Sequence, residues 1–310
     1  MPAQRKMLKG ALLMNIRHVL DHTPYRVKPG TKVKLKQYDP GYIGPFTDKT
    51  QGVKSLAEDV LALAEAQELL FASDTYAILL IFQAMDAAGK DGAIKHVMSG
   101  VNPQGCEVFS FKQPSTEELD HDFLWRCSKV LPERGRIGIF NRSYYEEVLV
   151  VRVHPEFLEA QRIPNLRKGD DLWRERYDDI NAFESHLHRN GTVILKFFLN
   201  VSKEEQRKRF LDRMNDAEKL WKFSARDALE REFWDDYMKA YEAMLSATST
   251  AHAPWYVIPA DKKWFARACV ADIITGQIES LKLKYPTVSE EKKRALLKVK
   301  RQLEAEAKKK

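Results

Sequence analysis

A loop centred on Gly89 and Lys90 carries the clearest chemical signal in the chain. The segment IFQAMDAAGKDGAIKHV, residues 81–97, follows an apolar run and leads into a predicted helix. It resembles the pattern G-x-x-x-x-G-K-[ST], in which backbone N–H groups and the lysine bind phosphate at the start of a helix. Ala84 replaces the first glycine, and Asp91 replaces the hydroxyl residue that normally binds Mg²⁺. The spacing therefore predicts a phosphate site with altered metal ligands.

Two carboxylates in this loop are unusual for a phosphate site. Asp86 and Asp91 would repel a phosphate unless a cation lay between them. They predict either a site that holds additional Mg²⁺, with Mn²⁺ as an alternative, or a site that activates a phosphate acceptor. Ordinary capping of a helix by aspartate is the structural alternative. The residues expected to contact phosphate are Ala87, Ala88, Gly89, Lys90, Asp91 and Gly92.

A second polar group follows the strand-like run RIGIF, residues 136–140. Asn141 and Arg142 come where P-loop kinases place a second metal-facing group, at the carboxyl end of a strand. Glu146 lies one helical turn after Arg142, so both side chains can face the same way. We expect these residues to point into the crevice where α/β proteins bind ligands. A helix cap with a surface ion pair is the alternative.

A basic segment, RKRFLDRMNDAEKLWKFSARD, spans residues 207–227. Arg209 and Arg213 are four residues apart and share one face of a predicted helix, and Lys219 and Lys222 follow. Small-molecule kinases use a basic helical lid that closes over phosphates and excludes water. We expect that role here, and a solvated basic helix is the alternative.

The elements around these residues alternate between strands and helices. Strands are predicted over 75–82, 106–112, 136–140, 192–201 and 255–259, with a short strand at 32–35. Helices are predicted over 53–70, from 91, over 115–130, 172–188, 203–214, 226–245 and 262–281, and in the charged terminal segment. Such alternation implies right-handed crossovers, so we expect an α/β fold with a mostly parallel sheet and helices on both faces.

Composition limits the classes of protein. The chain of 310 residues has a formal net charge of +7 and a pI of about 9.1, which favours polyanionic partners. No zinc spacing, RNA-recognition motif or helix-turn-helix pattern supports nucleic acid as that partner. The three cysteines are far apart, which argues against disulfides and favours a cytoplasmic protein. The interrupted apolar patch near the N-terminus is too short to cross a membrane, so we expect no membrane partner.

Four motifs in order resemble the polyphosphate kinase 2 family: DAAGKDG, FNRSYYEEV, WKFS and APWYVIPADKKWFAR. The resemblance covers roughly residues 53–281. It implies a thymidylate-kinase-like P-loop kinase fold, a three-layer αβα sandwich with a helical lid at about 207–227. The expected domains are an N-terminal extension over 1–52, a kinase domain over 53–285 and a charged helical tail over 286–310.

The resemblance also implies an activity. It is the Mg²⁺-dependent, reversible transfer of the terminal phosphoryl group of inorganic polyphosphate to AMP or ADP, which yields ADP or ATP. Guanine nucleotides are further candidate acceptors. Asn141 and Glu146, together with the segment VKPGTKVKLKQYDP, resemble the subgroup that phosphorylates both AMP and ADP. The family also implies a homo-oligomer, either a dimer or a tetramer.

The roles of individual residues follow from the same resemblance. The residues that it implies to be catalytic are Asp86, Lys90, Asn141, Arg142 and Arg213. The residues that it implies to bind polyphosphate, beyond those of the loop, are Lys112, Arg126, Arg134, Arg209, Lys219 and Lys222. Those implied to bind nucleotide are Asn141, Arg142 and Glu146, and those implied to bind metal are Asp86 and Asp91.

Two other functions stay open on the sequence alone. An ATP-dependent nucleotide or small-metabolite kinase would share the loop and the lid but would require ATP as its donor. A non-catalytic polyanion-binding protein would show salt-sensitive binding and no turnover with any donor.

Overall fold

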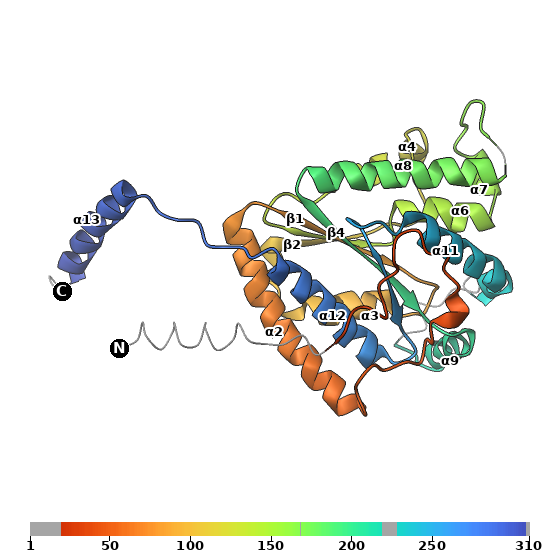
Figure 1. Ribbon diagram of the computed structural model, residues 1–310, viewed down its shortest axis with the longest axis horizontal. Helices are drawn as coiled ribbons and strands as arrows, with labels where there is room; N and C mark the ends of the chain where they lie inside the picture. Colours follow the sequence, from red (N-terminus) through yellow and green to blue (C-terminus); the bar gives the residue numbers. More distant parts are fainter. Residues whose placement is uncertain (1–19, 168, 219–227, 308–310) are drawn as a thin grey trace.

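A five-stranded parallel sheet forms the centre of the protein, and β1 is its middle strand (Figure 1). The computed structural model describes residues 20–167, 169–218 and 228–307. The strand order is β2-β3-β1-β4-β5. The strands are β1 Ala77–Gln83, β2 Cys106–Ser110, β3 Ile137–Asn141, β4 Thr192–Asn200 and β5 Trp255–Pro259.

Helices cover both faces of this sheet (Figure 1). One face carries α2 Lys49–Ser73, α3 Lys90–Val97 and α12 Lys263–Ser280, and α12 packs against both of the others. The other carries α8 Asp170–Arg189 and α11 Trp234–Thr248. Shorter helices are α4 Thr116–Leu119, α5 Trp125–Ser128, α6 Val150–Val153, α7 Glu156–Glu159 and α9 Lys203–Met214. The 3₁₀ turns are η1 Leu35–Gln37, η2 Met98–Gly100, η3 Pro103–Gly105, η4 Tyr144–Val148 and η6 Glu230–Phe233. The predicted mostly parallel sheet with helices on both faces is confirmed.

Three local predictions are wrong. Residues 115–130 form two short helices, α4 and α5, because the Asp122 carboxylate accepts the backbone N–H of Leu124 at 2.9 Å and interrupts the helical ladder. Residues 32–35 form no strand, because backbone N–H groups there bond to side chains of α11. The helix expected over 226–245 is interrupted, since the 3₁₀ turn η6 occupies Glu230–Phe233 and α11 begins at Trp234.

The middle strand β1 determines where the polar residues of the site lie. All seven of its residues are buried, as the continuous apolar run predicts for a strand covered on both faces. Phe82 of β1 pairs with Asn141 of β3 in parallel register. The carboxyl ends of both strands therefore meet at one edge of the sheet. The loop after β1 and the residues after β3 are brought together there.

The segments outside the sheet differ in how closely they pack. The stretch before α2 covers the edge of β5, where Val27 N–H donates to Trp255 O at 2.9 Å and Val257 N–H donates to Tyr25 O at 2.8 Å. In contrast, α13 Glu290–Ala307 stands apart from the sheet and its helices (Figure 1). The domain limits expected from the resemblance stay predictions.

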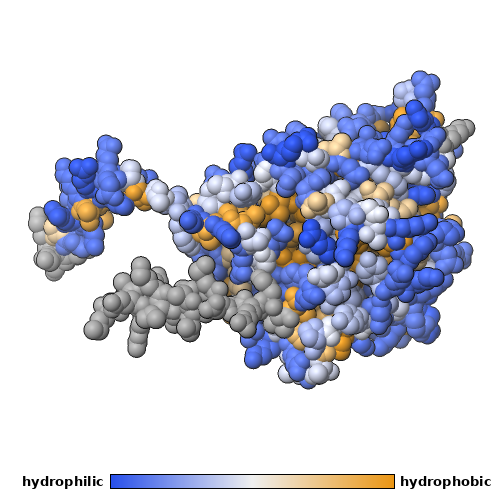
Figure 2. Space-filling view, viewed as in Figure 1, coloured by the Kyte–Doolittle hydropathy of each residue, from blue (hydrophilic) through white to orange (hydrophobic). Residues whose placement is uncertain are grey.

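The surface is mostly hydrophilic on the face that Figure 2 shows. Apolar side chains gather along α2, where Leu61 and Phe71 are 68% and 46% exposed. Among the described residues, no helix is long and apolar enough to cross a membrane.

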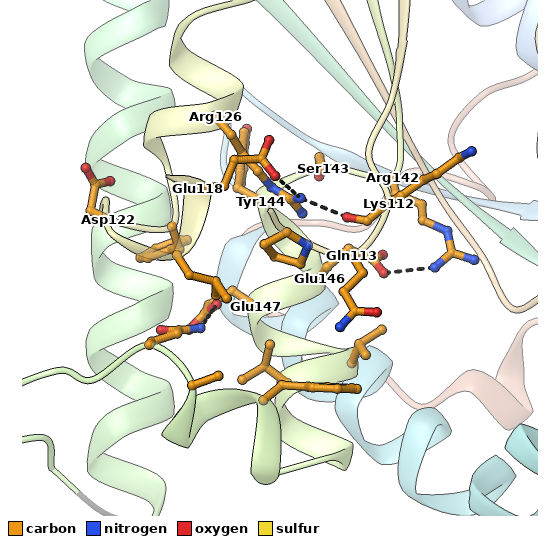
Figure 3. A pocket seen from close by; sticks show the side chains of 18 of the residues that line it. Lys112, Gln113, Glu118, Asp122, Arg126, Arg142, Ser143, Tyr144, Glu146 and Glu147 are labelled. Carbon is orange, nitrogen blue, oxygen red and sulfur yellow. Dashed lines mark hydrogen bonds and ion pairs between the residues drawn. The ribbon is translucent and has the colours of Figure 1, made fainter. Parts of the chain in front are cut away.

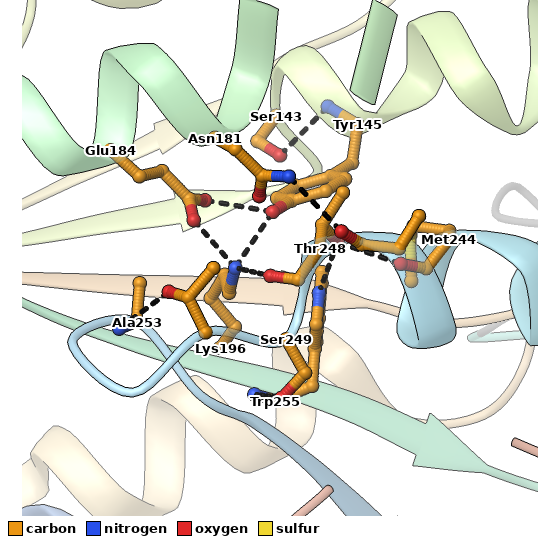
Figure 4. A network of polar contacts seen from close by, with 12 residues as sticks. Ser143, Tyr145, Asn181, Glu184, Lys196, Met244, Thr248, Ser249, Ala253 and Trp255 are labelled. Atoms are coloured by element: carbon orange, nitrogen blue, oxygen red, sulfur yellow. Dashed lines mark hydrogen bonds and ion pairs between the residues drawn. The ribbon is translucent and has the colours of Figure 1, made fainter. Parts of the chain in front are cut away.

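A buried ion pair between Lys196 and Glu184 lies behind the site (Figure 4). The Lys196 ammonium of β4 donates to Glu184 of α8 at 2.5 Å, to the Tyr145 hydroxyl at 2.8 Å and to Thr248 O at 2.7 Å. The hydroxyls of Tyr144 and Tyr145 each donate to Glu184 at 2.8 Å. Burial lowers the pKa of Lys196, and the charge of Glu184 partly opposes that change. Because both tyrosines belong to η4, this network fixes the turn that follows Asn141.

We predict that Lys196→Met destabilises the protein by about 3–5 kcal/mol, because it leaves the buried Glu184 carboxylate without its cation. The double variant Lys196→Met, Glu184→Gln should recover part of that loss. Lys239→Met, which removes an exposed ion pair with Asp236, is the matched control and should cost less than about 1 kcal/mol. Urea unfolding followed by circular dichroism measures all three, and equal losses at positions 196 and 239 would contradict the prediction.

Candidate active site

The loop between β1 and α3 has the backbone shape of an anion-binding loop. Ala87 and Gly89 have left-handed φ angles of 60° and 107°. Left-handed residues in a turn direct successive backbone N–H groups toward one side, which is the arrangement that binds phosphate. Ala84, which replaces the usual glycine, is not among the residues with positive φ, so its Cβ causes no backbone strain.

Lys90 begins α3 and points back across this loop. Its Nζ donates to the carbonyl of Ala84 at 2.9 Å, and the residue is only 8% exposed. Burial, helped by the nearby charge of Arg142, lowers the pKa of Lys90 to about 8. Asp86 and Glu146 act in the opposite direction but do not compensate. An anion bound beside Lys90 would therefore favour its charged form.

Arg142 connects two carboxylates across the crevice. Its Nη2 donates to Asp86 of the loop at 2.8 Å, and its Nη1 donates to Glu146 at 3.3 Å. Glu146 first, and then Asp86, raise the pKa of Arg142 against the effect of burial. The expectation from spacing that Arg142 and Glu146 face the same way is confirmed. The structure adds that Asp86, in the loop after β1, contacts Arg142 as well.

Asn141 contacts the second carboxylate of the loop. Its Nδ2 donates to Asp91 at 2.8 Å and to Ser110 Oγ at 3.4 Å. No group of three or more histidine, cysteine or acidic side chains could hold a metal ion within the described ranges. Asp86 and Asp91 nevertheless fit Mg²⁺, which prefers oxygen ligands and in kinases takes most of them from phosphates and water. Metal binding by these two residues stays a prediction.

Helix α9 supports the loop from behind. Gln206 Nε2 donates to Asp86 O at 2.9 Å. Arg209, which is 3% exposed, donates to Ala87 O at 3.0 Å and to Ala88 O at 2.8 Å. The side chain of Arg209 therefore contacts the carbonyl side of the loop. The backbone N–H groups of the loop, which would bind phosphate, lie on the other side. This placement differs from the lid position expected for Arg209, because its helix packs against the loop as part of the core.

A pocket of about 320 Å³ opens beside Arg142 (Figure 3). Lys112 and Arg126 line it, and Arg126 Nη1 donates to Lys112 O at 2.8 Å and lies 3.6 Å from Glu118. Its apolar lining includes Leu119, Val150, Val151, Phe157 and Ala160. The structure thus brings the predicted cations Lys112 and Arg126 into the same cavity as Arg142 and Glu146.

Arg134 does not join this group. It precedes β3, and its Nη2 donates to Asn190 O, which precedes β4, at 3.3 Å. A strand of five residues rises about 3.3 Å per residue and separates Arg134 from the edge where the loop lies. Two further predicted cations, Lys219 and Lys222, lie outside the described residues. Arg213, one turn beyond Arg209, is half-buried and lies 5.9 Å from the Phe210 ring centroid.

A second group of cations lies near the start of α12 and was not recognised as functional from the sequence. Lys208, Lys263 and Arg267 line a groove together with Lys49 and Lys262. A Cβ added at Gly92 would lie 3.3 Å from Arg267 Nη2, so Arg267 is close to the first turn of α3. Burial first, and then the charge of Arg209, lower the pKa of both Lys263 and Arg267. The sequence signal was the APWYVIPADKKWFAR motif, which contributes to the family resemblance but whose basic residues receive no role in the sequence analysis.

Comparison with known proteins places this geometry in context. The model of the family described as polyphosphate kinase 2 matches residues 46–286. A Rhodopseudomonas palustris protein named ADP-polyphosphate phosphotransferase is 54% identical over 281 residues, which cover 90% of this chain and 97% of that protein. A Meiothermus ruber protein named AMP/ADP-polyphosphate phosphotransferase is 44% identical, over 84% of this chain and 94% of its own length.

A solved structure is also similar. The crystal structure of polyphosphate kinase 2 from Arthrobacter aurescens has a TM-score of 0.82 and 40% sequence identity, and the match covers 91% of this chain and 98% of that one. The predicted P-loop kinase fold is confirmed by this similarity and by the parallel sheet.

We predict that the stability of the wild type, measured relative to Lys90→Met, rises between about pH 8 and pH 10. The native pKa of Lys90 is about 8, and an unfolded lysine titrates near about 10.4. Between these values the unfolded chain binds more protons, so the free energy of unfolding increases with pH, by about 3 kcal/mol in total. Below pH 8 both states are protonated and the difference should be flat. Urea titrations at several pH values measure it, and parallel profiles for the two proteins would refute the assignment.

Proposed function

Because the chain belongs to the polyphosphate kinase 2 family, we propose that it transfers the terminal phosphoryl group of inorganic polyphosphate to AMP and ADP, reversibly and with Mg²⁺. The resemblance found in the sequence motifs is confirmed by the family match. The observation that carries the proposal is the meeting of the loop lysine Lys90 with Asp86, Arg142 and Glu146 at one edge of the sheet.

The acceptor nucleotide occupies the pocket beside Arg142. Its phosphate lies toward Arg142, Lys112 and Arg126, which supply positive charge at one part of the cavity. Its nucleoside lies against the apolar lining from α6 and α7, where Val151 and Phe157 offer a surface for a base. A mononucleotide needs this combination of a charged end and an apolar wall.

The donor approaches from the other side of the loop, along the groove at the start of α12. Lys208, Lys263 and Arg267 line that groove and lie close to the loop, as the position of Arg267 beside Gly92 indicates. A row of cations suits a long chain of phosphates better than it suits a compact nucleotide. Arg213, one turn along α9, extends the same positive region.

The transfer breaks the bond between the terminal phosphorus and the bridging oxygen of polyphosphate, and it forms a bond from that phosphorus to a phosphate oxygen of the acceptor. The shortened polyphosphate keeps the bridging oxygen and its negative charge. The acceptor oxygen is already largely ionised at neutral pH, because the second pKa of a phosphate monoester is about 6. No protein base is needed, so the residues act by alignment and by stabilising charge.

The residues of the site then have distinct tasks. The loop N–H groups and Lys90 bind the phosphoryl group in transfer, and Arg142 binds the acceptor phosphate while it aligns Asp86. Asn141 orients Asp91. Mg²⁺, held by Asp86 and Asp91 together with phosphate oxygens, would neutralise negative charge where donor and acceptor meet. Homo-oligomer formation and a cytoplasmic location stay predictions.

We predict that the purified protein with Mg²⁺ and long-chain polyphosphate, but without ATP, forms ADP and ATP from AMP, and ATP from ADP. Chromatography of the nucleotides measures both products. ATP from ADP alone would restrict the acceptor to ADP, and ADP as the sole product from AMP would restrict it to AMP. Turnover only with ATP as donor would indicate a metabolite kinase, and salt-sensitive binding without turnover would indicate a binding protein.

Variants of the loop test the residue roles in the same assay. Lys90→Met and Asp86→Asn should each reduce kcat by at least about 10²-fold. The first removes the positive charge directed at the reacting phosphates, and the second removes a carboxylate proposed to hold Mg²⁺ beside them. Lys95→Met removes an exposed lysine from the same helix and should keep wild-type turnover. Near-normal kcat in folded Lys90→Met would contradict the assignment.

A further inference from the structure

Every N–H group of the Arg209 guanidinium is already bonded within the protein. Its Nε donates to Glu205 at 2.9 Å, its Nη1 donates to the two loop carbonyls described above, and its Nη2 donates to Ala260 O at 2.7 Å and Asp261 O at 3.0 Å. An arginine has five N–H donors, so none is left for a phosphate. The side chain is also 3% exposed, which removes it from contact with a ligand in solution.

We propose that Arg209 is a positioning residue that holds the loop in its anion-binding shape from behind, and that it does not bind polyphosphate itself. The proposal rests on the proposed function for its kinetic readout only. It assigns to α9 a task different from that of a lid: the helix presents Gln206 and Arg209, three residues apart, to three consecutive carbonyls, those of residues 86–88.

The geometry of the peptide plane explains why these carbonyls matter. In a trans peptide the C=O of one residue and the N–H of the next point in opposite directions. The bond to Ala88 O therefore directs the N–H of Gly89 away from Arg209, toward the side where phosphate binds. The bond to Ala87 O fixes the peptide whose N–H, that of Ala88, closes the turn onto Met85 O at 3.2 Å.

The backbone of the loop requires such support. Ala87 has a φ of 60°, a conformation that costs an alanine free energy and that persists only where the surrounding structure enforces it. The same guanidinium also bonds to the carbonyls of Ala260 and Asp261, which lead from β5 into α12. One side chain thus fixes the loop relative to the segment that carries Lys263 and Arg267.

A second contact connects this arrangement to the turn η6, which precedes α11. Gln206, which donates to Asp86 O, accepts a hydrogen bond from Arg231 Nη1 at 2.6 Å. The same Nη1 donates to Lys203 O at 3.0 Å. Because Arg231 belongs to η6, the face of α9 that holds the loop is itself held by the turn before α11.

The test compares four variants with the wild type by two measurements. The variants are Arg209→Lys, Gln206→Met, Arg213→Met and Arg207→Met. Amide hydrogen exchange of residues 84–91 in the ligand-free protein reports the shape of the loop. Steady-state kinetics with long-chain polyphosphate and ADP gives kcat and the KM for polyphosphate. Arg207→Met is the matched control, because Arg207 lies on the same helix, is exposed and pairs with Glu204.

Arg209→Lys keeps the charge but cannot bond to both carbonyl pairs, so it separates geometry from electrostatics. We expect its loop amides to exchange at least about tenfold faster, while unfolding of the whole protein in urea stays cooperative. We expect kcat to fall by about 10²-fold, since a misplacement of about 1 Å can cost that much, with a change in KM below about threefold. Gln206→Met should change both measurements in the same direction.

Arg213→Met should raise KM for polyphosphate and leave loop exchange unchanged, and Arg207→Met should alter neither measurement. Wild-type loop exchange in Arg209→Lys, with only a raised KM, would overturn the proposal and make Arg209 a phosphate ligand. If Arg209→Lys fails to fold, Gln206→Met decides by the same criteria. If the wild type shows no transfer from polyphosphate, the proposed function fails, but the exchange measurement still decides the role of Arg209.

Discussion

The parallel register between β1 and β3 is the constraint on which the site depends. With Phe82 opposite Asn141, the residues that follow each strand emerge at the same height and the same edge of the sheet. Arg142 can reach Asp86 at 2.8 Å only because of this pairing, since 56 residues separate the two in the chain. A shift of one residue would turn the side chains of one strand to the other face and would separate these groups. Burial of β1 on both sides makes that shift costly.

Charge balance is the second requirement of a site where two anions meet. Without phosphate, the loop carries Asp86 and Asp91, and each already has a hydrogen-bond donor, Arg142 or Asn141. These pairs keep the carboxylates oriented at little cost, because the partners are fixed by β3 and by η4. Lys90 instead donates to a neutral carbonyl, so a phosphate that displaces this contact adds the charge partner that Lys90 lacks. The site therefore favours an incoming anion at its lysine and an incoming cation at its aspartates.

The sequence predicts most of this architecture because the strands are continuous apolar runs and the loop has a recognisable spacing. Helical spacing predicts the contact between Arg142 and Glu146, but Arg142 has a φ of 65° and precedes the 3₁₀ turn η4, so this turn and not an α-helix brings the two side chains together. Other features depend on contacts between distant segments, which no local pattern reveals. Arg209 and Arg213 share a helix face by spacing, yet packing of α9 against the loop buries the first and leaves the second half-buried. Arg134, by contrast, precedes the strand predicted over 136–140, so its place at the opposite edge of the sheet from the loop follows from the position of that strand.

The distribution of burial among the cations divides them by role. Burying a charged side chain costs several kcal/mol unless hydrogen bonds satisfy it, so a buried cation is kept where its position matters more than its charge. Arg209 meets that condition with carbonyl acceptors and Lys196 with a carboxylate, and neither has a donor left for a ligand. If polyphosphate binds along the groove as proposed, the cations that line it, such as Lys208 and Lys263, would exchange water for phosphate as the chain moves past them. A phosphotransferase that uses a long donor needs both kinds: fixed cations that shape the loop, and accessible cations that let successive phosphates bind and leave.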